Sequence, residues 1–87
     1  MRLEFEKQAY LDLQYWKVKN SKKLEKILQL LENIQKTPFA GIGKPEGLKG
    51  NYSGLWSRRI DKEHRLIYKI ENEIIIVIQA RYHYERK

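Results

Sequence analysis

The sequence predicts an α+β domain in which two N-terminal helices pack on a mostly antiparallel, twisted sheet of four to five strands. Three observations predict it: an alternating segment at the N-terminus, a helical apolar stripe after it, and strand-like runs in the second half. A chain of 87 residues is expected to form a single domain over residues 1–87. Hydrophobic residues make up 41% of it, which is enough for one modest core.

A strand and a helix are expected first. In residues 1–5 apolar and charged side chains alternate, which is the period of a strand with one buried face. A helix follows over about residues 7–17, in which Ala9, Leu13 and Trp16 fall near helical spacing.

The second helix is predicted by a continuous apolar stripe. Its members are Leu24, Ile27, Leu28, Leu31 and Ile34. The helix is expected to begin after a break at Lys19–Ser21, where Asn20 or Ser21 can cap it. It should end near Thr37, because Pro38 disfavours the helical conformation of the residue before it.

An irregular loop is expected over residues 39–54, which contain all five glycines of the chain. A loop of this length in a compact domain is often functional. A short strand is predicted around Glu46–Leu48. Two hairpins then follow, in which isoleucine, valine and tyrosine dominate, as strands prefer. Their strands are Leu55–Ile60, His64–Ile70 and Ile74–Tyr84, with polar turns at 61–63 and 71–73.

The simplest register of the first hairpin, centred on Lys62, places Arg59 opposite Arg65 on the sheet face away from the helices. Like charges directly opposite each other are unfavourable. Either solvent or a carboxylate such as Glu63 compensates them, or the pair binds a phosphate through bidentate hydrogen bonds.

Extending this register to the last strand places Gln79, Arg81 and His83 on the same face as Arg65. His83 then lies near the 61–63 turn, several residues beyond Arg65. Convergence of His83 with Arg65 therefore requires a curved or bulged sheet.

The net charge of +7 favours a polyanionic partner, either a nucleic acid, an acidic protein or an anionic membrane. The glycine-rich segment 41–49 lacks the Gly-Lys-Ser/Thr ending of a nucleotide-binding loop. The two histidines, without any cysteine, give no ligand spacing for a metal, so neither metal nor cofactor is expected. No membrane-length apolar run and no signal peptide are visible, which favours a cytoplasmic protein.

Several motifs in the same order and spacing resemble the YoeB/Txe toxins of the RelE superfamily. They are Thr37-Pro38-Phe39, Gly43-Lys44-Pro45-Glu46, Leu48-Lys49, Ser53 to Ile60, Glu63 to Tyr68 and Arg81-Tyr82-His83-Tyr84. The similarity spans residues 1–84 and is dense over 37–68 and 80–84. The chain differs from the family in continuing past the His-Tyr pair with Glu85-Arg86-Lys87.

The resemblance implies a metal-independent endoribonuclease that enters the ribosomal A site, cleaves mRNA there and inhibits translation. The residues that match the family's catalytic positions are Glu46, Arg65, His83 and Tyr84. The residues expected to bind RNA are Lys49, Arg59, Arg58 and Arg81. The resemblance also implies a YefM-like antitoxin, an antitoxin complex that binds operator DNA, and a capacity to form a homodimer.

In the expected reaction the RNA supplies its own nucleophile, the 2′-hydroxyl. Glu46 is the candidate general base and His83 the candidate general acid, while Arg65 stabilises charge on the phosphate. Tyr84 would orient a base by stacking or the phosphate through its hydroxyl. The alternative is a non-catalytic protein of the same fold, such as a ParE-like gyrase inhibitor, which has no reason to keep these residues together.

Overall fold

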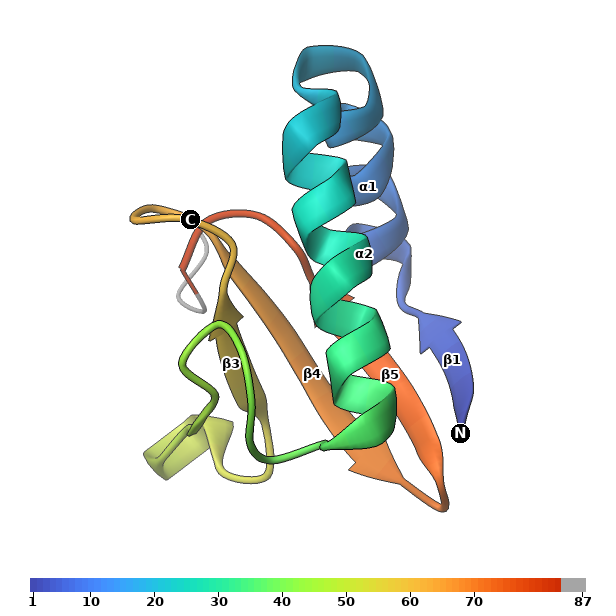
Figure 1. Ribbon diagram of the computed structural model, residues 1–87. Coiled ribbons are helices and arrows are strands. Elements are labelled where there is room, and N and C mark those ends of the chain that lie inside the picture. Colours follow the sequence, from blue (N-terminus) through green and yellow to red (C-terminus); the bar gives the residue numbers. More distant parts are fainter. Residues whose placement is uncertain (84–87) are drawn as a thin grey trace.

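Two helices lie side by side against one face of a five-stranded sheet (Figure 1) in the computed structural model, which describes residues 1–83. The elements are β1 (Arg2–Phe5), α1 (Lys7–Lys19), α2 (Ser21–Lys36), β2 (Glu46–Gly47), the short helix η1 (Gly50–Tyr52), β3 (Trp56–Arg59), β4 (Arg65–Glu71) and β5 (Ile74–Gln79). The strand order is β1-β5-β4-β3-β2, in which β1 runs parallel to β5 and the other pairs are antiparallel. The predicted α+β fold is therefore confirmed, with a mixed sheet.

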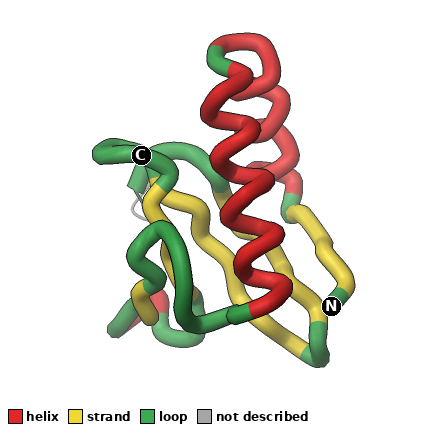
Figure 2. The backbone as a smooth tube through the Cα atoms, in the orientation of Figure 1, coloured by secondary structure: helices red, strands yellow, loops and turns green. Residues whose placement is uncertain are grey.

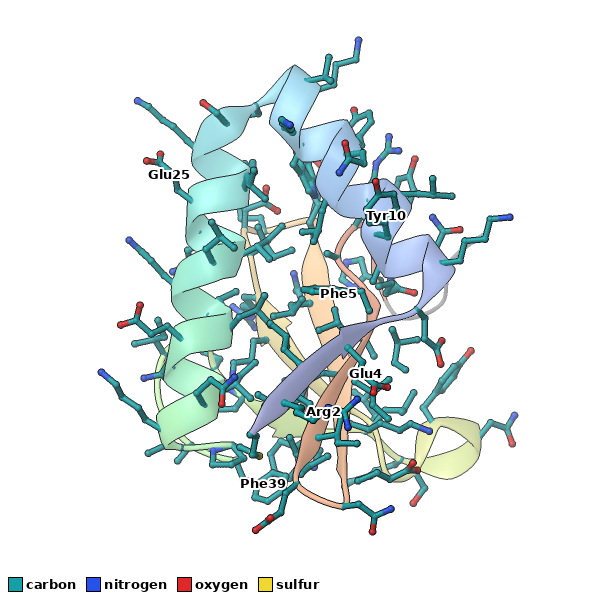
Figure 3. All side chains as sticks on the ribbon, turned by 90° about the vertical axis from the view of Figure 1, so that its right-hand side faces the viewer. Arg2, Glu4, Phe5, Tyr10, Glu25 and Phe39 are labelled. Atoms are coloured by element: carbon teal, nitrogen blue, oxygen red, sulfur yellow. The ribbon has the colours of Figure 1, made fainter. Side chains whose placement is uncertain are left out.

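Strand β1 forms one edge of the sheet, which Figure 3 views from that side. Leu3 and Phe5 each remain 37% exposed, so the predicted buried face of this strand is only partly covered. An edge strand has a neighbour on one side only, and this explains the incomplete cover.

Neither helix of the described residues has both the length and the apolar character needed to cross a membrane.

Helix α2 packs its apolar stripe on the sheet. The buried residues of the stripe are Ile27, Leu30, Leu31 and Ile34. Leu28 was predicted in the stripe, but it is 54% exposed, because it lies on the flank of the i, i+3, i+4, i+7 positions that face the sheet. The predicted cap is confirmed, since the Asn20 side chain accepts a hydrogen bond from the backbone of Lys22 at 3.1 Å.

Helix α1 contributes two side chains that end the last strand. The Asp12 carboxylate is 2% exposed and accepts a hydrogen bond from the Ala80 N–H at 2.9 Å. The Trp16 indole donates to the Ala80 carbonyl at 2.8 Å. Because both peptide groups of Ala80 are bonded to α1, they are not available to a neighbouring strand. Strand β5 therefore ends at Gln79, and the prediction that it continues to Tyr84 is wrong.

The predicted register of the first hairpin is confirmed. Arg59 lies opposite Arg65, and Trp56 lies opposite Tyr68. The second hairpin turns at Asn72 and Glu73, whose positive φ angles of 51° and 61° are those of a tight two-residue turn. The β4–β5 ladder shifts register between Ile67 and Tyr68, so the sheet does contain an irregularity close to the candidate site.

A buried arginine holds the long loop between α2 and β3. This loop runs from the end of the helix to the sheet edge formed by β2 (Figure 2). The Arg58 side chain is 0% exposed. Its guanidinium donates to the carbonyls of Thr37, Ala40 and Ile42 at 2.7, 2.9 and 3.0 Å, to Asn33 Oδ1 at 2.5 Å and to the Tyr68 hydroxyl at 3.1 Å. All five acceptors are uncharged oxygens, which group near the negative end of the α2 dipole.

Tyr68 completes this arrangement from β4. Its hydroxyl donates to the Pro38 carbonyl at 2.6 Å while accepting from Arg58. Burial raises the pKa of Tyr68 above the ordinary value of 10.0, although the neighbouring Arg58 cation acts in the opposite direction. The hydroxyl therefore remains a donor at neutral pH, as its bond to Pro38 requires.

The prediction that Arg58 binds RNA is wrong, because its guanidinium is enclosed between the sheet and the loop. Successive side chains of β3 point to opposite faces, so Arg58 shares the helix face with Leu66 while Arg59 lies on the other face.

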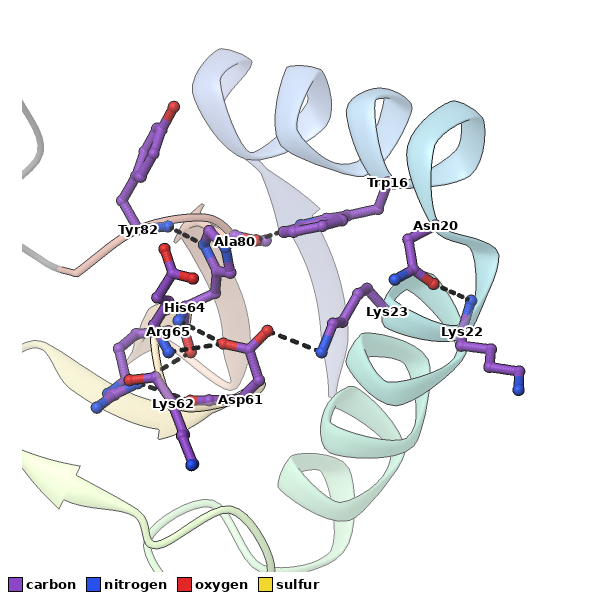
Figure 4. Close-up of polar contacts among 11 residues, drawn as sticks. Trp16, Asn20, Lys22, Lys23, Asp61, Lys62, His64, Arg65, Ala80 and Tyr82 are labelled. Atoms are coloured by element: carbon purple, nitrogen blue, oxygen red, sulfur yellow. Dashed lines mark hydrogen bonds and ion pairs between the residues drawn. The ribbon is translucent and has the colours of Figure 1, made fainter.

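The turn between β3 and β4 is closed by one carboxylate (Figure 4). Asp61 Oδ1 accepts from the backbone N–H groups of Glu63 and His64 at 2.8 and 2.7 Å. Its Oδ2 lies 2.8 Å from the Lys23 ammonium of α2. Burial by itself raises the pKa of Asp61, but these three partners outweigh it and hold the pKa below the ordinary 3.8.

Replacing Arg58 by methionine removes the guanidinium donor from four oxygens of residues 33–42, and among the hydrogen bonds of the described residues the carbonyls of Thr37 and Ile42 then keep no other side-chain donor. We expect Arg58→Met to lower the free energy of unfolding by roughly 3 kcal/mol or more, measured by urea denaturation. The exposed neighbour is the matched control, and Arg59→Met should change this free energy by no more than about 0.5 kcal/mol. Equal losses in the two variants would contradict the role of Arg58.

Asp61 predicts a pH dependence of stability. Because its folded-state pKa is lowered, its contribution is complete well above pH 3.8 and is lost as the pH falls through the lower folded value. Asp61→Asn should therefore be less stable than the wild type at pH 7, and the gap between them should shrink in acid. Denaturation curves of both proteins from pH 7 down to about pH 3 measure this. A gap that stays constant across the range would show that the carboxylate charge plays no part.

Candidate active site

A pocket of about 320 Å³ opens on the sheet face away from the helices. Its lining residues are Lys44, Pro45, Glu46, Ser57, Arg59 and Arg65. They come from three places: the loop up to the first residue of β2, strand β3, and the start of β4. The pocket thus brings three of the predicted site residues together, one carboxylate and two guanidinium groups. A smaller hollow beside α2 also contains an acid and a base, but there Glu32 and Lys36 pair with each other at 3.8 Å.

Among residues 1–83, no carboxylate forms an ion pair with either of the two opposed arginines. Arg65 Nη1 instead donates to backbone carbonyls of the adjoining turn, those of Asp61, His64 and Lys62 at 2.9, 3.1 and 3.3 Å. Within residues 1–83, no ion pair involves Arg59, Arg65, Glu46 or Glu63. The turn that Asp61 closes therefore orients Arg65, as Figure 4 shows, and leaves its charge available to a ligand.

Glu46 reaches the pocket because the loop is tied to β3 on both sides of Pro45. Glu46 itself pairs with Ser57 in the short β2–β3 ladder. The Gly43 carbonyl accepts from the Arg59 N–H at 2.7 Å. A Cβ at Gly43 would lie 2.7 Å from Leu30 Cδ2, and its φ of +81° is also unfavourable for other residues. Only glycine fits this close approach of the loop to the core.

The segment after β5 returns to the start of β4 (Figure 1). The Tyr82 carbonyl accepts from the Arg65 N–H at 2.9 Å, and the Tyr82 N–H donates to His64 Nδ1 at 2.8 Å. His83 therefore follows directly on the residue that pairs with Arg65. Its side chain is exposed, and it does not line the pocket. Tyr84 lies outside the described residues, as do Glu85, Arg86 and Lys87.

The prediction that Arg81 lies on the same face as Arg65 is wrong. Its guanidinium lies 3.5 Å from the ring centre of Tyr15 on α1 and 4.5 Å from that of Tyr82. The physical reason is that β5 ends at Gln79, so the strand alternation that placed Arg81 does not extend to it. Lys49 is exposed between β2 and η1, outside the pocket lining.

Three pocket residues were not predicted as site residues, Lys44, Pro45 and Ser57, and two of them are polar. Lys44 adds a third cation beside Glu46. Ser57 lies on β3, where it pairs with Glu46. The strand alternation already placed Ser57 on the Arg59 face, whereas Lys44 was considered only as part of a glycine-rich segment. Within the part of the chain that is described, no three acidic or histidine side chains gather as a metal site. The pocket chemistry is thus that of one carboxylate among cations.

Comparison with known proteins identifies the family. Residues 5–84 match the family model described as YoeB-like toxin of bacterial type II toxin-antitoxin system. A relative named Toxin YoeB from Streptomyces coelicolor is 45% identical over 84 residues, which cover 97% of this chain and 100% of that protein.

Solved structures agree with this family and with the fold. The YoeB/ParE toxin from Agrobacterium tumefaciens superposes with a TM-score of 0.94 at 43% identity, over 97% of this chain and 100% of that one. YoeB from Staphylococcus aureus has been solved in a complex with YefM, at 41% identity and a TM-score of 0.89, and as a dimer, at 40% and 0.90. Each covers 97% of this chain and 98% of the other. The chain described here therefore belongs to the YoeB-like toxins of bacterial type II toxin–antitoxin systems.

Proposed function

We propose that this toxin is a ribosome-dependent endoribonuclease that cleaves mRNA in the ribosomal A site and so inhibits translation. The observation that supports the proposal is the pocket in which Glu46, Arg59 and Arg65 meet without pairing with one another. Two guanidinium groups suit a phosphate, which they bind through charge-assisted hydrogen bonds. A carboxylate beside that phosphate is placed to accept a proton.

The first half of the reaction uses the RNA 2′-hydroxyl as the nucleophile. Glu46 accepts its proton, and the 2′-oxygen attacks the adjacent phosphorus. Arg65 stabilises the negative charge that grows on the phosphate oxygens, from a position fixed by its bonds to the turn carbonyls. Arg59 and Lys44 bind and position the RNA from the two sides of the pocket, and Lys49 binds it outside.

The second half breaks the bond to the 5′-oxygen. His83 donates a proton to that oxygen as it departs, because histidine is the side chain best suited to proton transfer near neutral pH. The products are a 2′,3′-cyclic phosphate and a 5′-hydroxyl, so the proton taken by Glu46 balances the one given by His83. Tyr84 would stack on a base or hold the phosphate. Every proton transfer is assigned to a side chain, so the scheme does not require a metal.

The partners proposed for this chain follow its family. A YefM-like antitoxin would bind this chain and hold it inactive; the Staphylococcus aureus relative has been solved in a complex with YefM. A homodimer, operator DNA as a target of the antitoxin complex, and a cytoplasmic location without membrane contact complete the proposal. The net charge of +7 favours the polyanionic partners among these.

A cleavage assay tests the function. The toxin is incubated with a defined mRNA, with and without programmed ribosomes, in the presence of a chelator that leaves the ribosomes intact. We expect a cut at the A-site codon only when ribosomes are present. Intact mRNA, despite folded toxin and programmed ribosomes, would overturn the proposal, and inhibition of gyrase would then be measured as the alternative.

The carboxylate of Glu46 can be removed with little change in shape. Glu46→Gln should lower the cleavage rate on the order of 100-fold, the usual scale for a general base. Its free energy of unfolding should not change, because the side chain is exposed and forms no ion pair with another described residue. Glu25→Gln on the outer face of α2 (Figure 3) is the matched control and should cleave as the wild type does. Unchanged cleavage by Glu46→Gln would remove the assigned base.

Arg65 and His83 are tested in the same assay. Arg65→Ala and His83→Ala should each reduce cleavage on the order of 100-fold or more, since one stabilises phosphate charge and the other protonates the leaving oxygen. The two roles are distinguished by Arg65→Lys, which restores a charge without the bidentate geometry and should recover activity only in part. Full ribosome-dependent activity in either alanine variant would remove the role given to that residue.

A further inference from the structure

Gln79, the last residue of β5, forms two hydrogen bonds to residues near the proposed general acid. Its side chain is only 6% exposed, on the same sheet face as its cross-strand neighbour Ile67. One terminal atom of the amide lies 2.8 Å from the Arg81 carbonyl oxygen and 2.6 Å from the His83 carbonyl oxygen. That atom must be the nitrogen, because an amide oxygen facing two carbonyl oxygens would be repelled.

These two bonds fold residues 80–83 over Gln79. A side chain that donates two and four residues ahead of itself closes the segment into a turn, and Tyr82 within this turn has a φ of +63°. A positive φ is costly for a tyrosine and persists only where surrounding contacts impose it. The turn thus depends on side-chain anchors, since β5 has already ended.

The other anchors hold the residues before His83 rather than His83 itself. Ala80 is bonded to Asp12 and Trp16, and Tyr82 to His64 and Arg65. Arg65 bonds the carbonyl of the peptide group that precedes His83, and among the hydrogen bonds of the described residues the one from Gln79 is the contact that reaches the carbonyl of His83 itself. Gln79 therefore holds the backbone on the C-terminal side of the Cα atom that carries the imidazole.

We propose that Gln79 is a positioning residue that holds the backbone of His83 and so sets the place of its imidazole, an inference that rests on the proposed function of His83 as general acid. Without the amide donor the carbonyls of Arg81 and His83 turn to water, and the backbone that carries the imidazole moves away from the scissile phosphate. A displacement of about 1 Å in a catalytic group can cost on the order of 100-fold in rate.

Gln79→Met tests this inference, because methionine has a similar length and no donor. We expect kcat for mRNA cleavage on programmed ribosomes to fall roughly 10- to 100-fold with KM little changed. A second RNA carries sulfur in place of the 5′-bridging oxygen at the cut. A thiolate leaves without being protonated, so both Gln79→Met and His83→Ala should cleave this RNA nearly as fast as the wild type.

A matched control excludes a general loss of stability. Leu3→Ala removes apolar surface from β1, the edge strand on the other side of the sheet from β2 and β3, and should cleave both RNAs as the wild type does. A Gln79→Met defect of equal size on both RNAs, or no defect on either, would overturn the inference. If Gln79→Met does not fold, Gln79→Glu keeps the shape of the side chain and directs an acceptor at the two carbonyls. Its cleavage defect on the ordinary RNA is then compared with its defect on the sulfur-containing RNA.

The geometric part is measured without any cleavage. Amide hydrogen exchange of the wild type and Gln79→Met should differ at Arg65 and Tyr82, whose N–H groups form the bonds between the turn and residues 64–65, and agree at Ile75 and Val77 in the core. Unchanged protection of Arg65 and Tyr82 would overturn the inference even if RNA is cleaved. If the wild type leaves mRNA intact while exchange changes as expected, the proposed function fails and the anchoring by Gln79 stands.

Discussion

The guanidinium of Arg58, buried with only neutral oxygens around it, is the interaction on which the candidate site most depends. It bonds the end of α2 and the first residues of the loop to the middle of the sheet. A lone buried cation is costly unless every N–H has a partner, so the arrangement is stable only when the loop supplies its carbonyls. The loop therefore has a defined path without regular structure, and Glu46 is delivered to the pocket at its end.

A second set of anchors acts on the opposite side of the pocket. Asp12 and Trp16 of α1 hold the two peptide groups of Ala80, and the chain beyond it turns back to pair with Arg65. Both irregular parts of the site are thus fixed by side chains that bond to backbone groups of distant residues. In a domain of this size, where the core is small, such bonds replace the rigidity that a longer strand or helix would provide.

The sequence was informative where structure is local and silent where it depends on distant contacts. Alternation and the polar turn predicted that Arg59 and Arg65 lie opposite each other. The same alternation puts Arg58 on the helix face and Arg59 on the other, but the oxygens that make the burial of Arg58 possible come from as far back as Asn33, 25 residues away. The end of β5 likewise depends on Trp16, 64 residues from Ala80. Neither separation leaves a periodic signal in the sequence.

The charges that line the pocket lower the stability of the fold. Arg59, Arg65 and Lys44 surround one carboxylate, and no ion pair among the described residues compensates the two arginines. Like charges held together destabilise a sheet, and substitutions that relieve them are the kind that stabilise a protein at the expense of function. In the proposed function, a phosphate between the guanidinium groups would turn this repulsion into attraction, so binding would favour a ligand with negative charge. The hydrogen bonds of Arg58 and Ala80 stabilise the fold against the repulsion between the arginines.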